Sequence, residues 1–281
     1  GSSFTIRKHN DTPISVPMLV GWGTWSAQMA AYLWLCLENG VSIFVCGETA
    51  SGKTTTLNAM TTFIPLEHKV YTVEQTPEIT LPHPIWQHLL TRESGQKTDV
   101  TMFDLLIASL RSRPDYIIVG EIRGAEASIL FQGMATGHAG LGTVHAEKFD
   151  DLVNRMTIAP INLPKQLITE LNIAIFMKQM KVRDNIVRRA ASIVEVINYN
   201  PKLDRFYTNE FVRFNAQEDN FKLKEKSAII EQLIEIRGGK EESVWTEIER
   251  RRRILDAMHK KKILEFKQVS DVIRAYYKES G

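Results

Sequence analysis

The sequence predicts an α/β fold with a mostly parallel sheet, followed by a small, mainly helical C-terminal region. Short apolar runs alternate with helical stretches between residues 41 and 198, a pattern typical of parallel strands with helices on both faces. One apolar run, 41–46, passes directly into a glycine-rich octapeptide and then into a helical stretch. After Pro201 one further strand precedes stretches that are all helical, which predicts a domain boundary near residue 200.

Proline, glycine and capping residues mark the predicted elements in chain order. The segment from Phe4 to Val16 is expected to be an extended connector or edge strand, because it mixes β-forming and polar residues around Pro13. A helix capped by Thr24 or Ser26 is expected to follow, with its apolar stripe in the core. Strands are then predicted over 41–46, 69–73, 116–119, 141–144, 174–180, 191–198 and 206–214. Helices are predicted over 24–38, 55–60, 101–110, 125–136, 150–157, 164–171, 226–236, 241–261 and 266–278, and a loop over 77–96.

The octapeptide Gly47–Thr54 has the spacing of a P-loop, which binds phosphate groups. Its glycines allow backbone N–H groups to turn toward phosphates at the positive end of the following helix. Lys53 is predicted to reach the β- and γ-phosphates, and Thr54 to ligate Mg²⁺. An unrelated Gly/Ser loop with an accidental lysine would not explain the strand and helix signals on either side. The predicted nucleotide-binding residues are Gly47, Glu48, Thr49, Ala50, Ser51, Gly52, Lys53, Thr54 and Thr55.

Polar residues follow the ends of other predicted strands, namely Glu74, Glu121 and His145. Ligand-binding groups of doubly wound sheets gather at the carboxyl ends of strands, so these side chains are expected to face the phosphates. Hydrolysis of a nucleoside triphosphate needs a carboxylate near the attacking water and a group that holds Mg²⁺. Glu121 could instead be a solvated acid at the start of a helix, and His145 a hydrogen-bonded loop histidine.

Arg92, Arg111, Arg113 and Arg123 are candidates for a positive charge at the γ-phosphate. Each lies near a predicted loop or helix end, and all are expected on the same side of the sheet. An arginine in that position can contribute roughly 10³- to 10⁵-fold in rate. Arg111 and Arg113 could instead favour a helix C-terminus, and Arg123 could pair with Glu126 on the surface. The sequence does not select among them.

Composition limits the function classes further. With 281 residues and 43% hydrophobic content, the chain can bury a substantial core. The longest apolar stretch, Met29–Leu37, is far shorter than the ~20 residues of a membrane-spanning helix, and no signal segment opens the chain, so a cytoplasmic protein is expected. Cys36 and Cys46 indicate neither a disulfide framework nor a metal cluster. The net charge of +2 gives no reason to expect nucleic acid.

Motifs around these residues identify a known family. They are the Walker A stretch above, an Asp box at Val73–Glu78, a Walker B stretch at Ile117–Arg123 with Gly120 before its acid, and a His box from Thr136 to His145. Together they resemble the secretion ATPases of type II secretion, type IV pili and the archaeal flagellum-like motor, most closely the archaeal branch. One departure is Gln75, where the Asp box usually carries Asp. The resemblance spans roughly residues 4–200.

The resemblance implies a RecA-like P-loop NTPase core that uses ATP and Mg²⁺. By this resemblance Glu74 would orient or polarise the attacking water, Glu121 would hold Mg²⁺ through water, and His145 would report the γ-phosphate to a ring of subunits. It further implies a homohexamer, a polytopic membrane platform protein as partner, no nucleic acid partner, and a peripheral position at the cytoplasmic, inner face of the cell membrane.

A domain order follows from the same resemblance. Residues 1–20 are expected to hold a tag remnant and a linker or the last strand of an absent N-terminal domain. Residues 21–200 are expected to form the ATPase core, and 201–281 a mainly helical subdomain. Because arginines of the absent domain would be missing, weak turnover is expected.

The function expected on these grounds is that of an ATP-hydrolysing motor, whose subunit motions drive filament assembly or rotation. A type IV secretion or conjugation ATPase is an alternative from the same superfamily. Gln75 leaves open a non-hydrolysing nucleotide-binding regulator. The basic cluster Arg250–Arg253 leaves open a nucleic-acid motor, although acids alternate with those arginines as on a solvated helix face.

Overall fold

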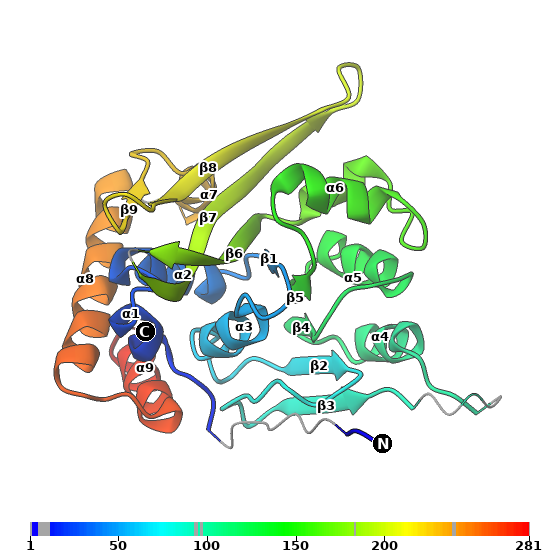
Figure 1. The fold of residues 1–281 in the computed structure, drawn as a ribbon, viewed down its shortest axis with the longest axis horizontal. Coiled ribbons are helices and arrows are strands. Elements are labelled where there is room, and N and C mark those ends of the chain that lie inside the picture. Colours follow the sequence, from blue (N-terminus) through cyan, green and yellow to red (C-terminus); the bar gives the residue numbers. More distant parts are fainter. Residues whose placement is uncertain are drawn as a thin grey trace.

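The computed structural model describes residues 2–4, 12–92, 95, 98–182, 184–237 and 240–280, and Figure 1 shows its fold. The strands in these ranges are β1 (Ile43–Gly47), β2 (Val70–Glu74), β3 (Trp86–Leu90), β4 (Tyr116–Val119), β5 (Ala139–Val144), β6 (Ile173–Val182), β7 (Asn185–Asn200), β8 (Arg205–Asn215) and β9 (Asn220–Leu223). The helices are α1 (Val16–Gly21), α2 (Ala27–Glu38), α3 (Lys53–Thr61), α4 (Met102–Arg111), α5 (Glu126–Ala135), α6 (Phe149–Thr157), the 3₁₀ helix η1 (Lys165–Glu170), α7 (Ala228–Arg237), α8 (Glu241–Lys260) and α9 (Phe266–Ser280).

The strands form one sheet in the order β3-β2-β4-β5-β1-β6-β7-β8-β9. Neighbouring strands from β3 to β6 pair in parallel, and those from β6 to β9 pair antiparallel. The predicted α/β class with a mostly parallel sheet is therefore confirmed. Because β1 lies in the interior of the parallel part, the loop that leaves its carboxyl end is flanked by other strand ends.

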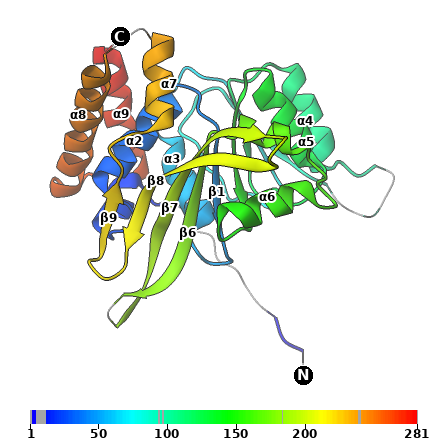
Figure 2. The same ribbon diagram turned by 90° about the horizontal axis from the view of Figure 1, so that it is seen from above.

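Helices cover both faces of the sheet, as Figures 1 and 2 show. Ile43 and Val45 of β1 belong to a hydrophobic cluster with α1, α2, α3 and the C-terminal helices. Phe44 and Cys46 belong to a second cluster with α4, α5 and α6. Successive side chains of a strand point to opposite faces, so a strand without polar alternation must be covered on both sides. The uninterrupted apolar run before the P-loop thus reflects its central, buried position.

Local capping signals were predicted correctly at two helix starts. The Ser26 hydroxyl accepts a hydrogen bond from the Met29 N–H at the start of α2. At α4, Thr101 and Asp104 form a reciprocal capping box, which satisfies backbone N–H groups that the first turn leaves unpaired. The apolar stripe of Trp25, just before α2, and Met29, Tyr32 and Leu33 on α2 is buried in the core, as predicted.

Some elements differ from the prediction. α1 begins at Val16 where an extended connector was expected, because Pro17 occupies the first turn, where a proline fits a helix. β3 lies inside the predicted 77–96 loop, whose prolines and histidines mask a short edge strand. The helix predicted over 164–171 is the 3₁₀ helix η1, closed by i to i+3 hydrogen bonds such as Leu167 N–H to Pro164 O. Residues 5–11 of the expected connector lie outside the described residues.

The sheet continues across residue 200. β8 pairs with β7 on the far side of the turn, and the two strands extend together beyond the rest of the sheet (Figure 1). Ile230 of α7 and Val269 of α9 share a cluster with core residues of α2. The division into an ATPase core and a C-terminal subdomain remains a prediction, in which the boundary would lie inside one continuous sheet.

Candidate nucleotide-binding site

The predicted P-loop connects β1 to α3 at the carboxyl edge of the parallel strands. Gly52 has φ +97° and caps α3, a conformation that glycine adopts at little cost. A Cβ atom on Gly47 would lie 2.4 Å from the Met177 carbonyl oxygen and 2.6 Å from Ser51 Oγ. The loop therefore packs against β6 at a distance that only glycine allows.

Lys53 lies in the first turn of α3 with 9% of its surface exposed. Its ammonium group donates a hydrogen bond of 2.8 Å to the Glu48 carbonyl oxygen, which also accepts from the Ser51 hydroxyl at 2.8 Å. Burial is the main factor that lowers the Lys53 pKa, and the Glu121 carboxylate opposes this shift. The only lysine of the octapeptide is thus held within the loop, close to the acids of the neighbouring strands.

A pocket of about 760 Å³ opens above the loop. The polar groups at the ends of β2, β4 and β5 line it together with Thr54, as the strand-end rule predicts. The predicted residues among its lining are Thr49, Ala50, Gly52, Lys53, Thr54, Thr55, Glu74, Glu121 and His145. The structure therefore brings the predicted strand-end residues together with the P-loop, while their individual roles remain predictions.

Glu121 connects the ends of β4 and β5. Its Oε1 lies 3.1 Å from His145 Nε2, and its Oε2 accepts a hydrogen bond of 2.5 Å from Arg123 Nη2. Burial alone would raise the Glu121 pKa, but the Arg123 guanidinium and the His145 and Lys53 charges lower it overall, so the carboxylate is ionised. Burial and the Lys53 ammonium lower the His145 pKa. The Glu121 carboxylate opposes this lowering, so each group favours the charged form of the other.

Glu74 ends β2 and is 1% exposed. Its Oε1 accepts backbone hydrogen bonds from Glu78 at 2.9 Å and Ile79 at 3.0 Å. Its Oε2 lies 2.9 Å from His88 Nε2 on β3. Burial raises the Glu74 pKa, and the two backbone N–H groups and His88 oppose that rise. This carboxylate is fixed in place, whereas Glu121 is more accessible.

The predicted arginines do not gather at the pocket. Arg92 is outside its lining and donates a hydrogen bond of 2.6 Å to the Thr98 carbonyl. The expectation that Arg111 and Arg113 share the P-loop side is wrong, because α4 runs back to the amino ends of the strands before β4 begins. There Arg113 lines a separate hollow. A role for these three in catalysis remains a prediction.

Arg123 does line the pocket and pairs with Glu121 through its side chain. The sequence also allowed a surface ion pair between the side chains of Arg123 and Glu126. Glu126 instead accepts from the backbone N–H groups of Arg123 and Gly124, at 2.6 and 2.7 Å. Of the arginines considered from sequence, Arg123 is thus the one that the described structure places beside the P-loop.

Two further arginines on β7 were missed. Arg188 Nε donates a hydrogen bond of 2.8 Å to the Ala50 carbonyl of the P-loop. Arg189 is buried, pairs with Asp219 at 3.2 Å and donates to the Trp22 carbonyl at 3.0 Å. The sequence signal was the basic turn between the predicted strands, but only the pairing of β6 with both β1 and β7 brings that turn to the loop.

The oxygen donors of the pocket suit Mg²⁺ bound to a nucleotide. Mg²⁺ prefers hard oxygen ligands and commonly keeps several waters while it binds substrate phosphates. The Thr54 hydroxyl and the Glu121 carboxylate both line the pocket, so one could ligate directly and the other through water. Among the described residues, no group of three or more His, Cys, Asp or Glu side chains could hold a metal ion.

The fold is RecA-like, and the loop between β1 and α3 has the sequence spacing and position of a P-loop. Residues 1–258 match the family described as Type II/IV secretion system protein, and the chain belongs to this family of secretion ATPases. The resemblance inferred from the motifs is thereby confirmed. Of the helices in the described ranges, none is long and apolar enough to cross a membrane.

Similar proteins include two from Methanocaldococcus jannaschii. Uncharacterized protein MJ0900 is 46% identical over 99% of the chain, which spans only 52% of that protein's length. Uncharacterized protein MJ1287 is 40% identical over 89% of the chain and 97% of its own length. The type IV secretion system protein PtlH of Bordetella pertussis is 36% identical over 53% of the chain and 44% of its own length. The chain thus spans about half the length of the first relative.

Solved structures share the fold. The VirB11 ATPase of the Brucella suis type IV secretion system has a TM-score of 0.52 and 24% identity, covering 66% of this chain and 64% of its own. The Legionella pneumophila ATPase DotB has a TM-score of 0.51 and 19% identity, covering 70% of this chain and 54% of its own. At this level of identity the likeness concerns architecture alone.

Proposed function

We propose that this chain binds Mg-ATP in the P-loop pocket and hydrolyses it. The observation that carries the proposal is the convergence of Lys53, Glu74, Glu121 and His145 on one pocket from separate strand ends. Phosphoryl transfer depends on the positions of charged groups around the phosphates rather than on covalent chemistry by the protein. This arrangement supplies a cation, an anchored acid and an accessible acid within one site.

Each of these residues has a proposed role. Lys53 exchanges its contact with the Glu48 carbonyl for the β- and γ-phosphates, while Thr54 ligates Mg²⁺. Glu121 would hold Mg²⁺ through water. Arg123, which pairs with Glu121, would be able to turn toward the phosphates. Glu74, fixed by two backbone N–H groups, orients the attacking water. His145 contacts Glu121 and so reports changes at the γ-phosphate.

Nucleotide binding and phosphate release test this proposal separately. We expect Lys53→Ala to abolish binding of a fluorescent ATP analogue, since the phosphates lose their closest cation. We expect Glu121→Gln to bind the analogue but to release phosphate at least roughly 100-fold more slowly. Glu210→Gln on β8, outside the pocket lining, is the matched control. Unchanged phosphate release in Glu121→Gln would favour the non-hydrolysing regulator.

The cellular role proposed for this activity is that of a motor for a type II secretion, type IV pilus or archaellum machine. In that role the chain acts in a homohexamer at the cytoplasmic face of the membrane, on a polytopic platform protein, to drive filament assembly or rotation. Its family membership supports this role. Light scattering with and without Mg-ATP tests the hexamer, and co-purification from native membranes tests the platform partner.

A type IV secretion ATPase is the second candidate. PtlH, a type IV secretion protein, is 36% identical to this chain over roughly half of its length. This similarity favours the second candidate. The identity of the co-purified polytopic protein distinguishes this candidate from the filament motor, because a filament platform and a secretion channel differ in composition. Weak turnover of this chain alone also remains a prediction.

A further inference from the structure

A histidine on the edge strand contacts the buried acid of the pocket. His88 Nε2 lies 2.9 Å from Glu74 Oε2. Apart from each other, neither of these two atoms has a hydrogen-bond partner in the described part of the chain. The other carboxylate oxygen already accepts the N–H groups of Glu78 and Ile79. His88 therefore provides the remaining contact of a carboxylate that is almost completely removed from solvent.

The imidazole is itself held by its own strand. The Trp86 indole lies against it with ring centroids 5.2 Å apart and an interplanar angle of 21°. Trp86 Nε1 in turn donates a hydrogen bond of 2.9 Å to Thr72 Oγ1 on β2. In the parallel register His88 lies opposite Thr72, two residues before Glu74. Packing against Trp86 therefore holds the His88 ring where its Nε2 can contact Glu74, two residues further along β2 than Thr72.

We propose that His88 is a positioning residue for catalysis, which holds the Glu74 carboxylate in the orientation and charge state needed to direct the attacking water. The proposal rests on the role of Glu74 in the proposed ATPase. His88 does not line the pocket, so we place its effect on Glu74 rather than on the phosphates or the attacking water. Its contribution is to fix Oε2 while the backbone N–H groups fix Oε1.

The charge balance around Glu74 makes this contact effective. Burial favours the neutral acid and raises the Glu74 pKa, whereas the two backbone N–H groups and His88 favour the carboxylate. Other charged or titratable groups line the same pocket as Glu74. They are Lys53, Glu78, Glu121, Arg123, His145, Arg188 and Arg189. Of the side chains whose charge acts on Glu74, His88 has the largest effect.

The amide signals of Ile79 and Glu78 report this contact without any turnover. Their N–H groups bond to Glu74 Oε1, so their chemical shifts follow the protonation of Glu74 in a pH titration by NMR. We expect His88→Gln and His88→Ala to move the midpoint up by about one pH unit, because the buried carboxylate loses a stabilising charge. A midpoint within error of the wild-type value overturns the proposal.

Turnover measurements test the catalytic consequence. The acid limb of the phosphate-release rate should move to higher pH in His88→Gln, with kcat lowered and KM for ATP unchanged. A purely structural residue would lower activity equally at all pH values, and that result overturns the positioning role. If the wild-type chain does not turn over, the ATPase proposal fails while the amide titration still decides the His88 contact. His88→Gln retains a side-chain N–H donor, so it serves if His88→Ala does not fold.

Discussion

Gly120, directly before Glu121, lies against the other pocket acid. A Cβ atom at this position would be 3.1 Å from Glu74 Cγ and 3.4 Å from its Oε1. Separations this short force one side chain to move, and the Glu74 carboxylate is held by two backbone N–H groups. The glycine of the Walker B stretch therefore makes room for the acid of the Asp box.

Gly120→Ala should consequently impair hydrolysis more than binding. In the proposed mechanism Glu74 orients the attacking water, so a displacement of a few tenths of an ångström would misplace that water. We expect a loss of roughly tenfold in kcat. KM for ATP should stay within about twofold, because Lys53 and Thr54 are untouched. Steady-state phosphate release gives both values, with circular dichroism as the control for folding. An unchanged kcat would show that the Glu74 position tolerates this shift.

His83 makes the stability of the fold sensitive to acid. It is 6% exposed, its Nε2 lies 3.1 Å from the Ile64 carbonyl oxygen, and burial lowers its pKa from 6.5 to about 4. Between these values the unfolded chain binds a proton that the folded chain does not. The free energy of unfolding therefore falls as the pH drops from about 6.5 to about 4.

His83→Gln should remove this dependence. Between pH 7 and pH 5 we expect the wild type to lose about 2 kcal/mol more of its unfolding free energy than the variant does. Urea denaturation followed by circular dichroism at the two pH values measures the difference. His138→Gln, at a half-buried loop position, is the comparison that should behave as the wild type. Equal losses in wild type and His83→Gln would mean that His83 is protonated in the folded protein.

At the scale of elements, the β6–β7 hairpin closes the outer side of the P-loop. β6 pairs with β1 as far as Met177 opposite Gly47, and a bulge between Phe176 and Met177 shifts its register to β7 there. This places Arg188 where its guanidinium bonds to the Ala50 carbonyl. The hairpin thus adds a positive charge to a loop that already contains Lys53.

Arg188→Ala should weaken nucleotide binding. Loss of a charged contact to an exposed loop costs about 1 kcal/mol, so we expect Kd for the fluorescent ATP analogue to rise roughly fivefold. Lys181→Ala on the same hairpin is the matched control, because Lys181 is 69% exposed, pairs only loosely with Asp184 and is outside the pocket lining. Equal affinities for wild type and Arg188→Ala would show that the contact serves the loop conformation alone.

The sequence predicts those parts of the site that depend on local order. The β1–loop–α3 unit follows from the spacing of Gly47, Gly52 and Lys53 after an apolar run. Glu74 and Glu121 can be predicted because each lies within two residues of the end of an apolar run, and the carboxyl ends of parallel strands meet at one edge. Such inferences need only the neighbouring residues and the direction of the strands.

The site residues that could not be predicted from sequence depend on pairing between strands that are distant along the chain. His88 belongs to an edge strand whose half-buried pattern has no strong apolar period. Arg188 reaches the P-loop only through the register of two antiparallel strands. Arg111 and Arg113 were misplaced because the sequence gives the end of a helix but not the direction in which that helix runs along the sheet.

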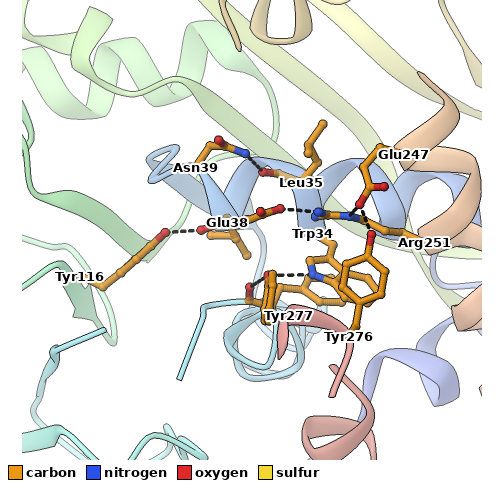
Figure 3. Close-up of polar contacts among 11 residues, drawn as sticks. Trp34, Leu35, Glu38, Asn39, Tyr116, Glu247, Arg251, Tyr276 and Tyr277 are labelled. Atoms are coloured by element: carbon orange, nitrogen blue, oxygen red, sulfur yellow. Dashed lines mark hydrogen bonds and ion pairs between the residues drawn. The ribbon is translucent and has the colours of Figure 1, made fainter. Parts of the chain in front are cut away.

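For the whole molecule, one buried arginine connects the C-terminal helix α8 to α2. Arg251 of α8 is 2% exposed; its Nε lies 3.0 Å from Glu247 Oε1, and its Nη2 pairs with Glu38 at the end of α2. Figure 3 shows these contacts around Trp34, whose ring lies 5.1 Å from the guanidinium carbon. Tyr276 of α9 donates to the same Glu247 oxygen.

A second contact of α9 reaches the P-loop helix. Tyr277 accepts a hydrogen bond of 2.8 Å from Trp34 Nε1 and donates one of 2.7 Å to the Phe63 carbonyl, just beyond α3. The Trp34 and Phe63 rings stack 5.4 Å apart at 5°. The C-terminal helices therefore pack as part of the core that holds the P-loop helix.

Arg251→Met should accordingly destabilise the whole fold. Two carboxylates, both less than a third exposed, would lose their shared cation, at a cost of roughly 2–3 kcal/mol once their partial solvation is allowed for. Arg251→Lys should recover only part of this stability, because one ammonium cannot reproduce the forked contact to both acids and the packing on Trp34.

Arg253→Ala is the matched control. Its side chain is 74% exposed and pairs with Glu249 on the same helix, so the substitution should leave stability unchanged. Urea unfolding of the three variants measures these differences, and equal stability of Arg251→Met and Arg253→Ala would show that α8 and α9 are held by apolar packing alone.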